Sequence, residues 1–204
     1  MAVITISKEY GINSSEIASE LSKRLGYEYI DKHLVAKIAE KLHISEHETE
    51  AFIKASSGRL LRFVDRYTCT LVQKVVDRSH GCLDDDNYFM TTKKLVEDIY
   101  KEGNAIILGW GGQCILKGKP GTLHVRLVKQ KEAKIKTVME DQKVDEKAAR
   151  KIIEKEETEM REYIKQFFHE DWNDSRLYDL VINLGKTPAE EAISQIIDNI
   201  KHIK

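Results

Sequence analysis

The sequence is poor in the residues that mark disulfide-rich or linker-rich proteins. It has two prolines and three cysteines among 204 residues, with neither an internal repeat nor a low-complexity linker. Cys69, Cys82 and Cys114 are odd in number, widely spaced and in no CxxC pair, which argues against a disulfide framework or a zinc site. We therefore expect reduced thiols in one compact unit.

Two further absences bear on where the chain works. No stretch approaches the roughly 20 apolar residues of a membrane span, and the first residues lack the pattern of a secretion signal. The 33 basic and 34 acidic residues give a net charge of −1, so there is no overall basic field to hold nucleic acid or an anionic membrane. The sequence predicts a cytoplasmic protein that binds neither of them and recognises anions only locally.

What the chain has instead is an alternation of short apolar runs and helical patterns. Five β-like runs occupy residues 2–7, 27–30, 105–108, 122–128 and 180–183. Several are continuously apolar, which is typical of strands buried on both faces of a parallel sheet. The helical patterns between them predict an α/β fold with right-handed crossovers.

Two helices can be placed from their end signals. Apolar residues recur every four positions after Asn13 and stop at Gly26, and Asn13 with Glu16 is typical of a reciprocal N-terminal cap. The last helix opens at Thr187 as a cap, with Pro188 at its first helical position.

Two long helical segments interrupt the alternation. The segment between residues 30 and 105 is far longer than one crossover needs, so a helical subdomain is inserted there. The segment at about 131–168 interleaves acidic and basic residues, which fits either a mobile arm or a solvated helical hairpin.

The first apolar run leads into a turn with half of the features of a phosphate site. In "SKEYGINSSEIA", residues 7–18, Gly11 permits close backbone approach, and free N–H groups with the helix dipole favour an anion. Set against the signature GxxxxGK[ST], however, Lys8 and Asn13 stand at the two glycines and Ser14 at the lysine. The turn alone fits either a degenerate phosphate site or an ordinary capped α/β turn.

Three blocks of sequence, taken in order, resemble one known family. They read "VITISKEYG…SEIASELSKRLGYEYIDKHLVAKIAE", "AIILGWGGQCILKGKPGTLHVRLV" and "MREYIKQFFHEDWNDSRLYDLVINLG". Together they are similar to the main blocks of the cytidylate-kinase-like family, which belongs to the P-loop nucleoside monophosphate kinases. The resemblance covers nearly the whole chain.

The resemblance implies a single P-loop kinase domain over residues 1–204. Its fold would be a three-layer sandwich around a five-stranded parallel sheet, in agreement with the five apolar runs. The implied parts are a core at about residues 1–30, 103–130 and 177–204, an acceptor-binding helical insertion at about 31–102, and a lid at about 131–176.

For the nucleotide, the resemblance implies binding by Gly11, Ile12, Asn13, Ser14, Ser15 and Glu16. Relatives often read "SREYGSGGREIA" at this turn, so the missing lysine, and a glutamate in place of the hydroxyl, look like family traits. Lys8 would act on the donor phosphates as a catalytic residue. Glu16 would ligate Mg²⁺ or, alternatively, only cap Asn13, since a carboxylate beside phosphates is repulsive.

For the acceptor, the candidate residues are Asp31, Lys37, Trp110 and Arg126. Asp31 begins "DKHLVAK", comparable to the "DTGAMYR" of cytidylate kinases, which places Lys37 at an acceptor-contacting arginine; alternatively Lys37 is an exposed helical lysine. Relatives read "GRG" where this chain has Trp110 between two glycines, and the tryptophan would stack on a base or fill a core gap. Arg126, within a buried run, would face the nucleotide or pair with an acid.

Arg161 in "MREYI" falls at the lid arginine of the family. There it would neutralise charge on the transferred phosphoryl group, as a second catalytic residue. Its alternative role is a helical ion pair with Glu157, four residues earlier.

These residues favour transfer of the γ-phosphoryl group of ATP, with Mg²⁺, to a nucleoside monophosphate or a similar small acceptor. A nucleotide-binding regulatory module with weak or no kinase activity is one alternative, because the chain lacks both the lysine of the signature and the acceptor arginine. An interaction protein without nucleotide binding is another. The sequence leaves open whether the chain forms a homodimer.

Overall fold

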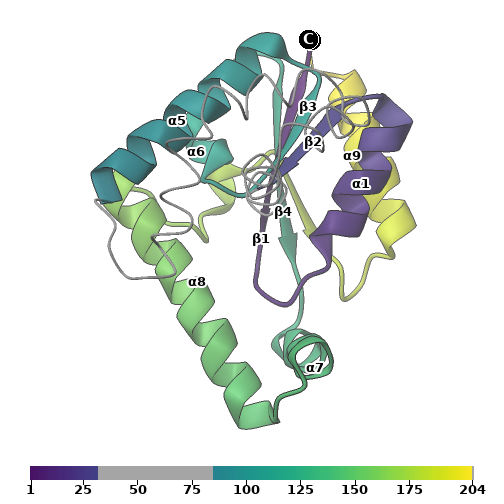
Figure 1. Cartoon of the computed structure of the whole chain (residues 1–204). Coiled ribbons are helices and arrows are strands. Elements are labelled where there is room, and N and C mark those ends of the chain that lie inside the picture. Colours follow the sequence, from purple (N-terminus) through teal and green to yellow (C-terminus); the bar gives the residue numbers. More distant parts are fainter. Residues whose placement is uncertain (32–84, 204) are drawn as a thin grey trace, which may run out of the picture.

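A five-stranded parallel sheet forms the centre of the computed structural model, which describes residues 1–31 and 85–203 (Figure 1). The strand order is β2-β3-β1-β4-β5, and every pairing is parallel. The strands are β1 (Val3–Lys8), β2 (Glu28–Asp31), β3 (Ala105–Leu108), β4 (Thr122–Val128) and β5 (Leu180–Asn183). All five predicted strands are confirmed, the first two shifted by one residue and the others with unchanged bounds.

The strands form at the continuous apolar runs because both faces of the sheet are covered. Every residue of β3 is buried, as are the first five residues of β1. Successive side chains point to opposite faces, so Ile4 and Ile6 belong to one core cluster while Val3 and Ile107 belong to the other.

Helices cover both faces and complete a three-layer sandwich. α1 (Ser14–Leu25) and α9 (Ala189–Lys201) pack on the face that carries Ile4 and Ile6. α5 (Asp85–Glu102) and the short α6 (Gly112–Ile115) lie on the other face (Figure 1). The predicted α/β sandwich is therefore confirmed.

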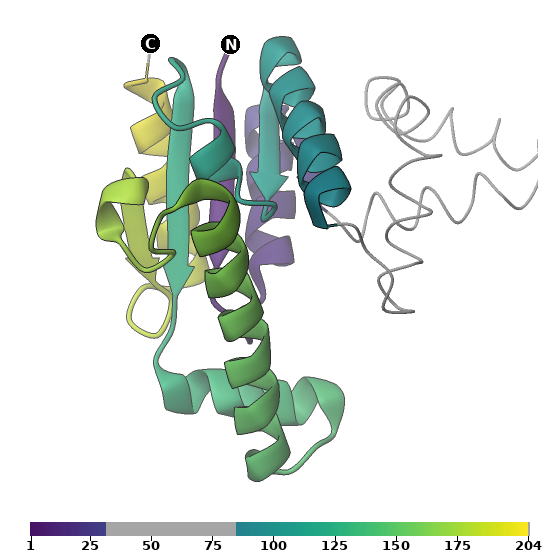
Figure 2. The same ribbon diagram turned by 90° about the vertical axis from the view of Figure 1, so that its left-hand side faces the viewer.

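After β4 the chain forms a helical hairpin beyond the sheet. It consists of α7 (Lys131–Gln142) and α8 (Glu146–Phe168). Figure 2 shows the hairpin at the end toward which the strands run, opposite the two termini. The two helices meet along an apolar seam of Ile135, Val138, Ala149 and Ile153. The charged segment is thus a helical hairpin with a core of its own.

The far end of α8 is anchored on the body of the protein. Phe167 stacks on Phe89 of α5 with ring centroids 4.6 Å apart, and Phe168 meets the same ring edge-on. A loop and a 3-10 turn, Ser175–Leu177, then lead into β5. One helix therefore joins the hairpin to the layer that contains α5.

The helix ends differ from expectation in their caps. Asn13 precedes α1, but its ψ of 69° is far from the extended conformation of a capping residue, and its side chain makes no capping bond. The predicted reciprocal cap between Asn13 and Glu16 is therefore wrong. α9 begins at Ala189, one residue after Pro188, also without a side-chain cap. Gly26 ends α1 in the left-handed conformation, as predicted.

No helix in the described part of the chain is both long and apolar enough to cross a bilayer. Cys114 is a free thiol, whereas Cys69 and Cys82 lie outside the described residues. Burial is the main cause that raises the pKa of the Cys114 thiol to about 12. The thiol is therefore protonated at neutral pH, as expected for a structural cysteine.

Candidate functional site

A cavity of about 450 Å³ lies at the carboxyl ends of β1, β2 and β3. This volume suits a small-molecule site, and ligands of open α/β sheets bind at this edge of the strands. The strand ends and the turn after β1 line one side, and α8 lines another. The cavity therefore lies where the residues expected to bind nucleotide and acceptor should meet.

Charge in this cavity is unevenly divided. Among the described residues that line it, Lys8 is the one cation. The lining carboxylates are Glu9, Asp31, Glu156, Glu157 and Glu159. A phosphate group in the cavity would need the neutralisation of some of these carboxylates, by Mg²⁺ or by protein cations.

The end of β1, the turn after it and the start of α1 together line one wall of the cavity. Lys8, Tyr10 and Ser15 all line it, and Ser15 lies in the first turn of α1, where N–H groups lack helical partners. The Lys8 ammonium donates to the Ile12 carbonyl at 3.2 Å, so it lies along the turn. The Lys8 ammonium and the start of α1 therefore lie close together beside the cavity.

The other residues of the turn are distributed differently. Ile12 is buried in the core beside α1, and Asn13 is exposed. Ser14 is buried, and its hydroxyl has no hydrogen-bond partner among the described residues. Gly11 has a φ of +79°, which favours glycine. A side chain there would meet the backbone of α7, so the close approach at Gly11 is made by this helix.

Glu16, the Mg²⁺ ligand expected from the sequence, does not line this cavity. It lies in a separate shallow groove between α1 and α9, together with Ser15 and Ile193. Its alternative role, the reciprocal cap with Asn13, is not observed either. No group of three or more metal-binding side chains exists within residues 1–31 and 85–203.

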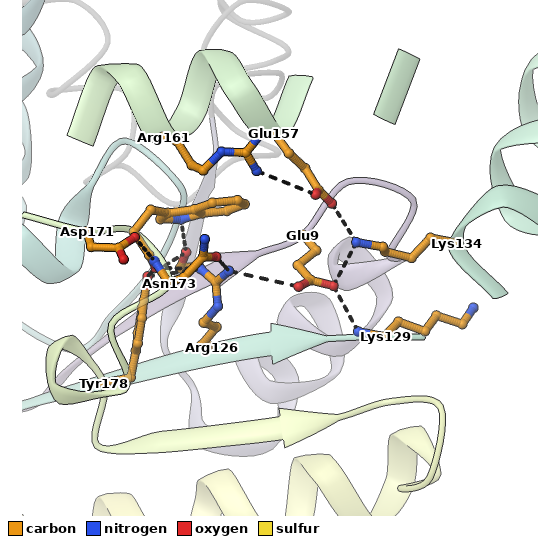
Figure 3. A network of polar contacts seen from close by, with 11 residues as sticks. Glu9, Arg126, Lys129, Lys134, Glu157, Arg161, Asp171, Asn173 and Tyr178 are labelled. Atoms are coloured by element: carbon orange, nitrogen blue, oxygen red, sulfur yellow. Dashed lines mark hydrogen bonds and ion pairs between the residues drawn. The ribbon is translucent and has the colours of Figure 1, made fainter. Parts of the chain in front are cut away.

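A buried ion-pair network connects the turn with both helices of the hairpin (Figure 3). The ammonium of Lys134, on α7, lies 3.0 Å from Glu9 Oε2 and 2.6 Å from Glu157 Oε1. Glu9 Oε2 also accepts a hydrogen bond from the Lys129 backbone at 3.2 Å. Sequence reasoning missed Glu9 and Lys134, because their partners lie far away along the chain.

Arg126 lies behind the cavity wall and is almost fully buried, with 4% of its side chain exposed. It donates to the Trp172 carbonyl, the Tyr178 hydroxyl and Asn173 Oδ1 at 2.9 to 3.1 Å. Its guanidinium lies 4.1 Å from the centroid of the Trp172 ring, which itself lines the cavity. Two roles were expected for Arg126: facing the nucleotide or pairing with an acid. The structure shows the pair, because the Arg126 guanidinium lies 4.0 Å from the Glu9 carboxylate.

Trp172 and Tyr178 are held firmly around this guanidinium. The Trp172 indole N–H donates to Ser7 Oγ at 2.9 Å, and the Tyr178 hydroxyl donates to the Trp172 carbonyl at 2.8 Å. Burial raises the pKa of Tyr178, which keeps its hydroxyl protonated as a donor. The segment after α8 is thereby tied to β1 and β4.

Trp110 follows β3 and packs into the core. It belongs to the cluster between the sheet and α5, is 7% exposed, and also lines the cavity. Its φ of 55° is unusual for a bulky residue, and the neighbours Gly109 and Gly111 also have positive φ values. Core packing, one of its two expected roles, therefore describes most of this side chain.

Asp31 and Arg161 complete the expected residues. Asp31, at the end of β2, is buried, lines the cavity and accepts a hydrogen bond from the Tyr29 hydroxyl. Arg161 is 40% exposed on α8, donates to Thr158 Oγ1 at 2.7 Å and lies 4.0 Å from Glu157, its predicted helical partner. Lys37 lies outside the described residues.

Comparison with known proteins supports the expected relationship. Residues 3–186 match the cytidylate kinase-like family. A search of curated proteins found no significant match. Among solved structures, an uncharacterized protein from Eubacterium ventriosum is 21% identical with a TM-score of 0.66, covering 98% of this chain and 99% of that one.

Two named kinases share the fold at lower identity. Shikimate kinase from Bacteroides thetaiotaomicron is 11% identical with a TM-score of 0.55, covering 98% of both chains. A gluconokinase from Sinorhizobium meliloti is 10% identical with a TM-score of 0.53, covering 98% of this chain and 96% of that one. At these identities the likeness concerns the fold alone. The family match, which spans most of the sequence, goes further: this chain belongs to the cytidylate kinase-like family.

Proposed function

We propose that the protein transfers the γ-phosphoryl group of Mg-ATP to a small acceptor, with a nucleoside monophosphate as the first candidate. The observation that carries this proposal is the cavity between the turn after β1 and helix α8, at the carboxyl ends of three parallel strands. Family membership and the kinase fold of the solved structures agree with it. The proposed place of action is the cytoplasm.

The donor phosphates would lie against the turn from Lys8 to Ser15. Lys8 supplies a cation, and the first turn of α1 supplies N–H groups and the positive end of its dipole. The buried Ser14 hydroxyl, which has no partner in the described part of the chain, is a further polar group at this junction. These residues fit an anionic ligand.

Mg²⁺, when bound, would neutralise charge on the phosphates. The carboxylates that line the cavity are oxygen donors of the kind that Mg²⁺ prefers, either directly or through water. Glu16, by contrast, lies in the other groove. The ion would thus depend on ATP and water for most of its ligands.

The acceptor would occupy the part of the cavity that is lined by Asp31 and Trp110. The Asp31 carboxylate would accept hydrogen bonds from acceptor hydroxyl or amino groups, and the exposed edge of Trp110 would contact an apolar or aromatic part. Arg126 would act indirectly, by holding Trp172 in the cavity wall. Lys37 remains a proposed contact.

Arg161 would act on the transferred phosphoryl group. In this structure its side chain is directed to Thr158 and Glu157 and does not line the cavity. A rotation of this half-exposed side chain would bring its charge to the phosphates, where one arginine is worth roughly 10³ to 10⁵ in turnover.

The excess of carboxylates among the described lining residues favours one alternative. A regulatory module that binds nucleotide but transfers slowly or not at all would need less complete neutralisation of the phosphates. This alternative retains the fold and the cavity and differs from the first only in the chemical step.

A coupled phosphotransfer assay with ATP and a panel of nucleoside monophosphates tests the proposal. We expect turnover with at least one acceptor, and a loss of about 10³-fold in Arg161→Ala. Arg150→Ala is the matched control, because Arg150 is an exposed arginine on the same helix, paired with Glu146; it should keep wild-type turnover.

Calorimetry with Mg-ATP separates the alternatives. Heat of binding without transfer above the level of Arg161→Ala would indicate the regulatory module. Absence of any heat at millimolar Mg-ATP would reject nucleotide binding and leave the interaction protein.

A further inference from the structure

The hairpin of α7 and α8 contacts the turn after β1 through a buried lysine. Lys134 lies in the second turn of α7, and only 7% of its side chain is exposed. Its ammonium bridges Glu9, in the turn, and Glu157, on α8 (Figure 3). A buried cation between two carboxylates couples all three segments, because removing it would deprive both carboxylates of their nearest cation.

Glu9 is the member of this network that belongs to the turn, and it is held from several sides. Its backbone N–H donates to the Leu127 carbonyl at 3.1 Å, and its carboxylate accepts from the Lys129 backbone. The guanidinium of Arg126 lies 4.0 Å from its other oxygen. Glu9 is thus held at β4 by its hydrogen bonds, and the Lys134 ammonium is the cation nearest to its carboxylate.

Steric contacts place α7 on the same turn independently of charge. A Cβ atom on Gly11 would lie 2.9 Å from the Lys134 carbonyl oxygen, so the turn and the helix backbone touch at this point. Tyr10 packs against the apolar seam of the hairpin, and Gln142 donates to its hydroxyl at 2.7 Å. The conformation of the turn therefore depends on where α7 lies.

Lys134 also changes the charge that the cavity presents. Glu9 and Glu157 both line the cavity, whereas Lys134 does not and reaches them from behind. Without the ammonium, Glu9 would keep only Arg126 and Glu157 only Arg161, each at 4.0 Å, so both carboxylates would face a bound phosphate less well neutralised. The signature lysine that this turn lacks is thus replaced, in part, by a cation outside the turn.

We propose that Lys134 is a positioning residue: it holds the turn of residues 9–13 in its phosphate-receiving conformation and neutralises Glu9 and Glu157 for an anionic ligand. The inference rests on the proposed function for its ligand, Mg-ATP. The claim that Lys134 holds the turn in place depends only on contacts within the protein.

The test compares Lys134→Met with Lys136→Met. Lys136 lies on the same helix, is 79% exposed and approaches Glu140 only at 4.0 Å, so it controls for a lost lysine on α7. Circular dichroism and thermal melting establish that each variant is folded. Amide hydrogen exchange over residues 9–13 and calorimetry with Mg-ATP are then measured for both variants and wild type.

In Lys134→Met we expect exchange at the turn to rise about tenfold and the Kd for Mg-ATP to rise about tenfold or more, as for the loss of one coupled buried contact. Lys136→Met should match wild type in both measurements. Lys134→Arg should recover most of the affinity, because it restores the charge between the two carboxylates. Lys134→Arg restores stability as well as charge, so the exchange at residues 9–13 and the Kd, measured on folded variants, separate positioning from stability alone.

Glu9→Gln, combined with Lys134→Met, completes a double-mutant cycle that measures the coupling between Lys134 and Glu9. If Lys134 acts through Glu9, the double variant should show no more exchange at the turn than Lys134→Met alone. Should Lys134→Met fail to fold, Lys134→Gln, which keeps polar contact with both carboxylates, is measured against the same criteria.

Unchanged exchange at residues 9–13 in a folded Lys134 variant would overturn the inference. An equal effect of Lys136→Met would do the same. If wild type gives no heat with Mg-ATP, the proposed function fails, and the claim that Lys134 holds the turn in place is then decided by the exchange data alone.

Discussion

At the scale of single residues, several buried polar groups in this protein are balanced by partners that lie far away in sequence. His124 is an example: its imidazole Nδ1 is 2.8 Å from Thr5 Oγ1, on the neighbouring strand β1. Its backbone N–H donates to Asp179, just before β5. A titratable ring is thus buried on one face of the sheet.

The stability of the protein should fall when the pH falls below about 6.5, where an unfolded histidine takes up a proton. Burial lowers the pKa of His124 in the folded state, although Asp179 opposes this shift. The unfolded chain then binds more protons than the folded one, so the free energy of unfolding decreases in acid and is fully retained above this pH. Urea denaturation between about pH 8 and pH 5 measures the effect.

His124→Gln is the control for that series, because glutamine does not titrate in this range. Its absolute stability is expected to be lower, but the difference from wild type should shrink as the pH falls. A constant difference across the series would show that His124 contributes nothing to the pH dependence.

At the scale of helices and strands, the two hairpin helices are held by different means. α7 rests on the turn after β1, whereas α8 is capped at its start and anchored by aromatic rings at its end. Asp145 provides the cap, since its side chain accepts from the Ala148 N–H at 2.7 Å. The start of α8 is therefore the part that depends most on one local bond.

Asp145→Ala should destabilise the first turn of α8 by about 1 kcal/mol, the usual cost of losing a capping side chain. Hydrogen exchange at Ala148 and its neighbours should become roughly fivefold faster. Asp145→Asn, an equally good cap, should exchange like wild type. Identical exchange in the alanine and asparagine variants would show that the cap has no influence here.

At the scale of the whole molecule, Arg126 joins parts of the chain that are distant in sequence. It lies on β4, contacts the segment from Trp172 to Tyr178, and through Trp172 is connected with Ser7 on β1. Three segments thus share one buried guanidinium.

Arg126→Met should lower the free energy of unfolding by about 2 to 4 kcal/mol. Methionine preserves much of the volume but leaves the Asn173 oxygen and the Trp172 carbonyl with fewer donors. Urea denaturation followed by circular dichroism measures the change. The control Arg176→Met removes an exposed arginine from the same segment and should leave stability unchanged; comparable losses in the two variants would contradict this role.

Much of the fold could be predicted because it depends on local pattern. The apolar runs at residues 105–108, 122–128 and 180–183 became strands with unchanged bounds, and Gly26 ended α1. The caps were predicted less well: Asn13 and Thr187 have suitable side chains, but capping also requires a backbone conformation that the neighbouring packing sets.

The candidate site could be predicted only in part. Lys8, Ser15, Asp31 and Trp110 do meet at one cavity, because each lies at or just after the carboxyl end of a strand or at the start of the next helix, and parallel strands bring these ends together. Glu16 does not, since the direction of α1 carries it into the groove toward α9. Its place could be known only once the helices were packed.

The sequence by itself determined the layers, the strands, the family and the absence of the signature lysine, which Ser14 replaces, because these follow from hydrophobic period and from motif. Only the tertiary structure decided which charges meet. Lys134 bridges Glu9 and Glu157 across separations that no local pattern encodes. The physical reason is that a buried charge requires an opposite charge beside it, but the packing of distant segments decides which residue provides it.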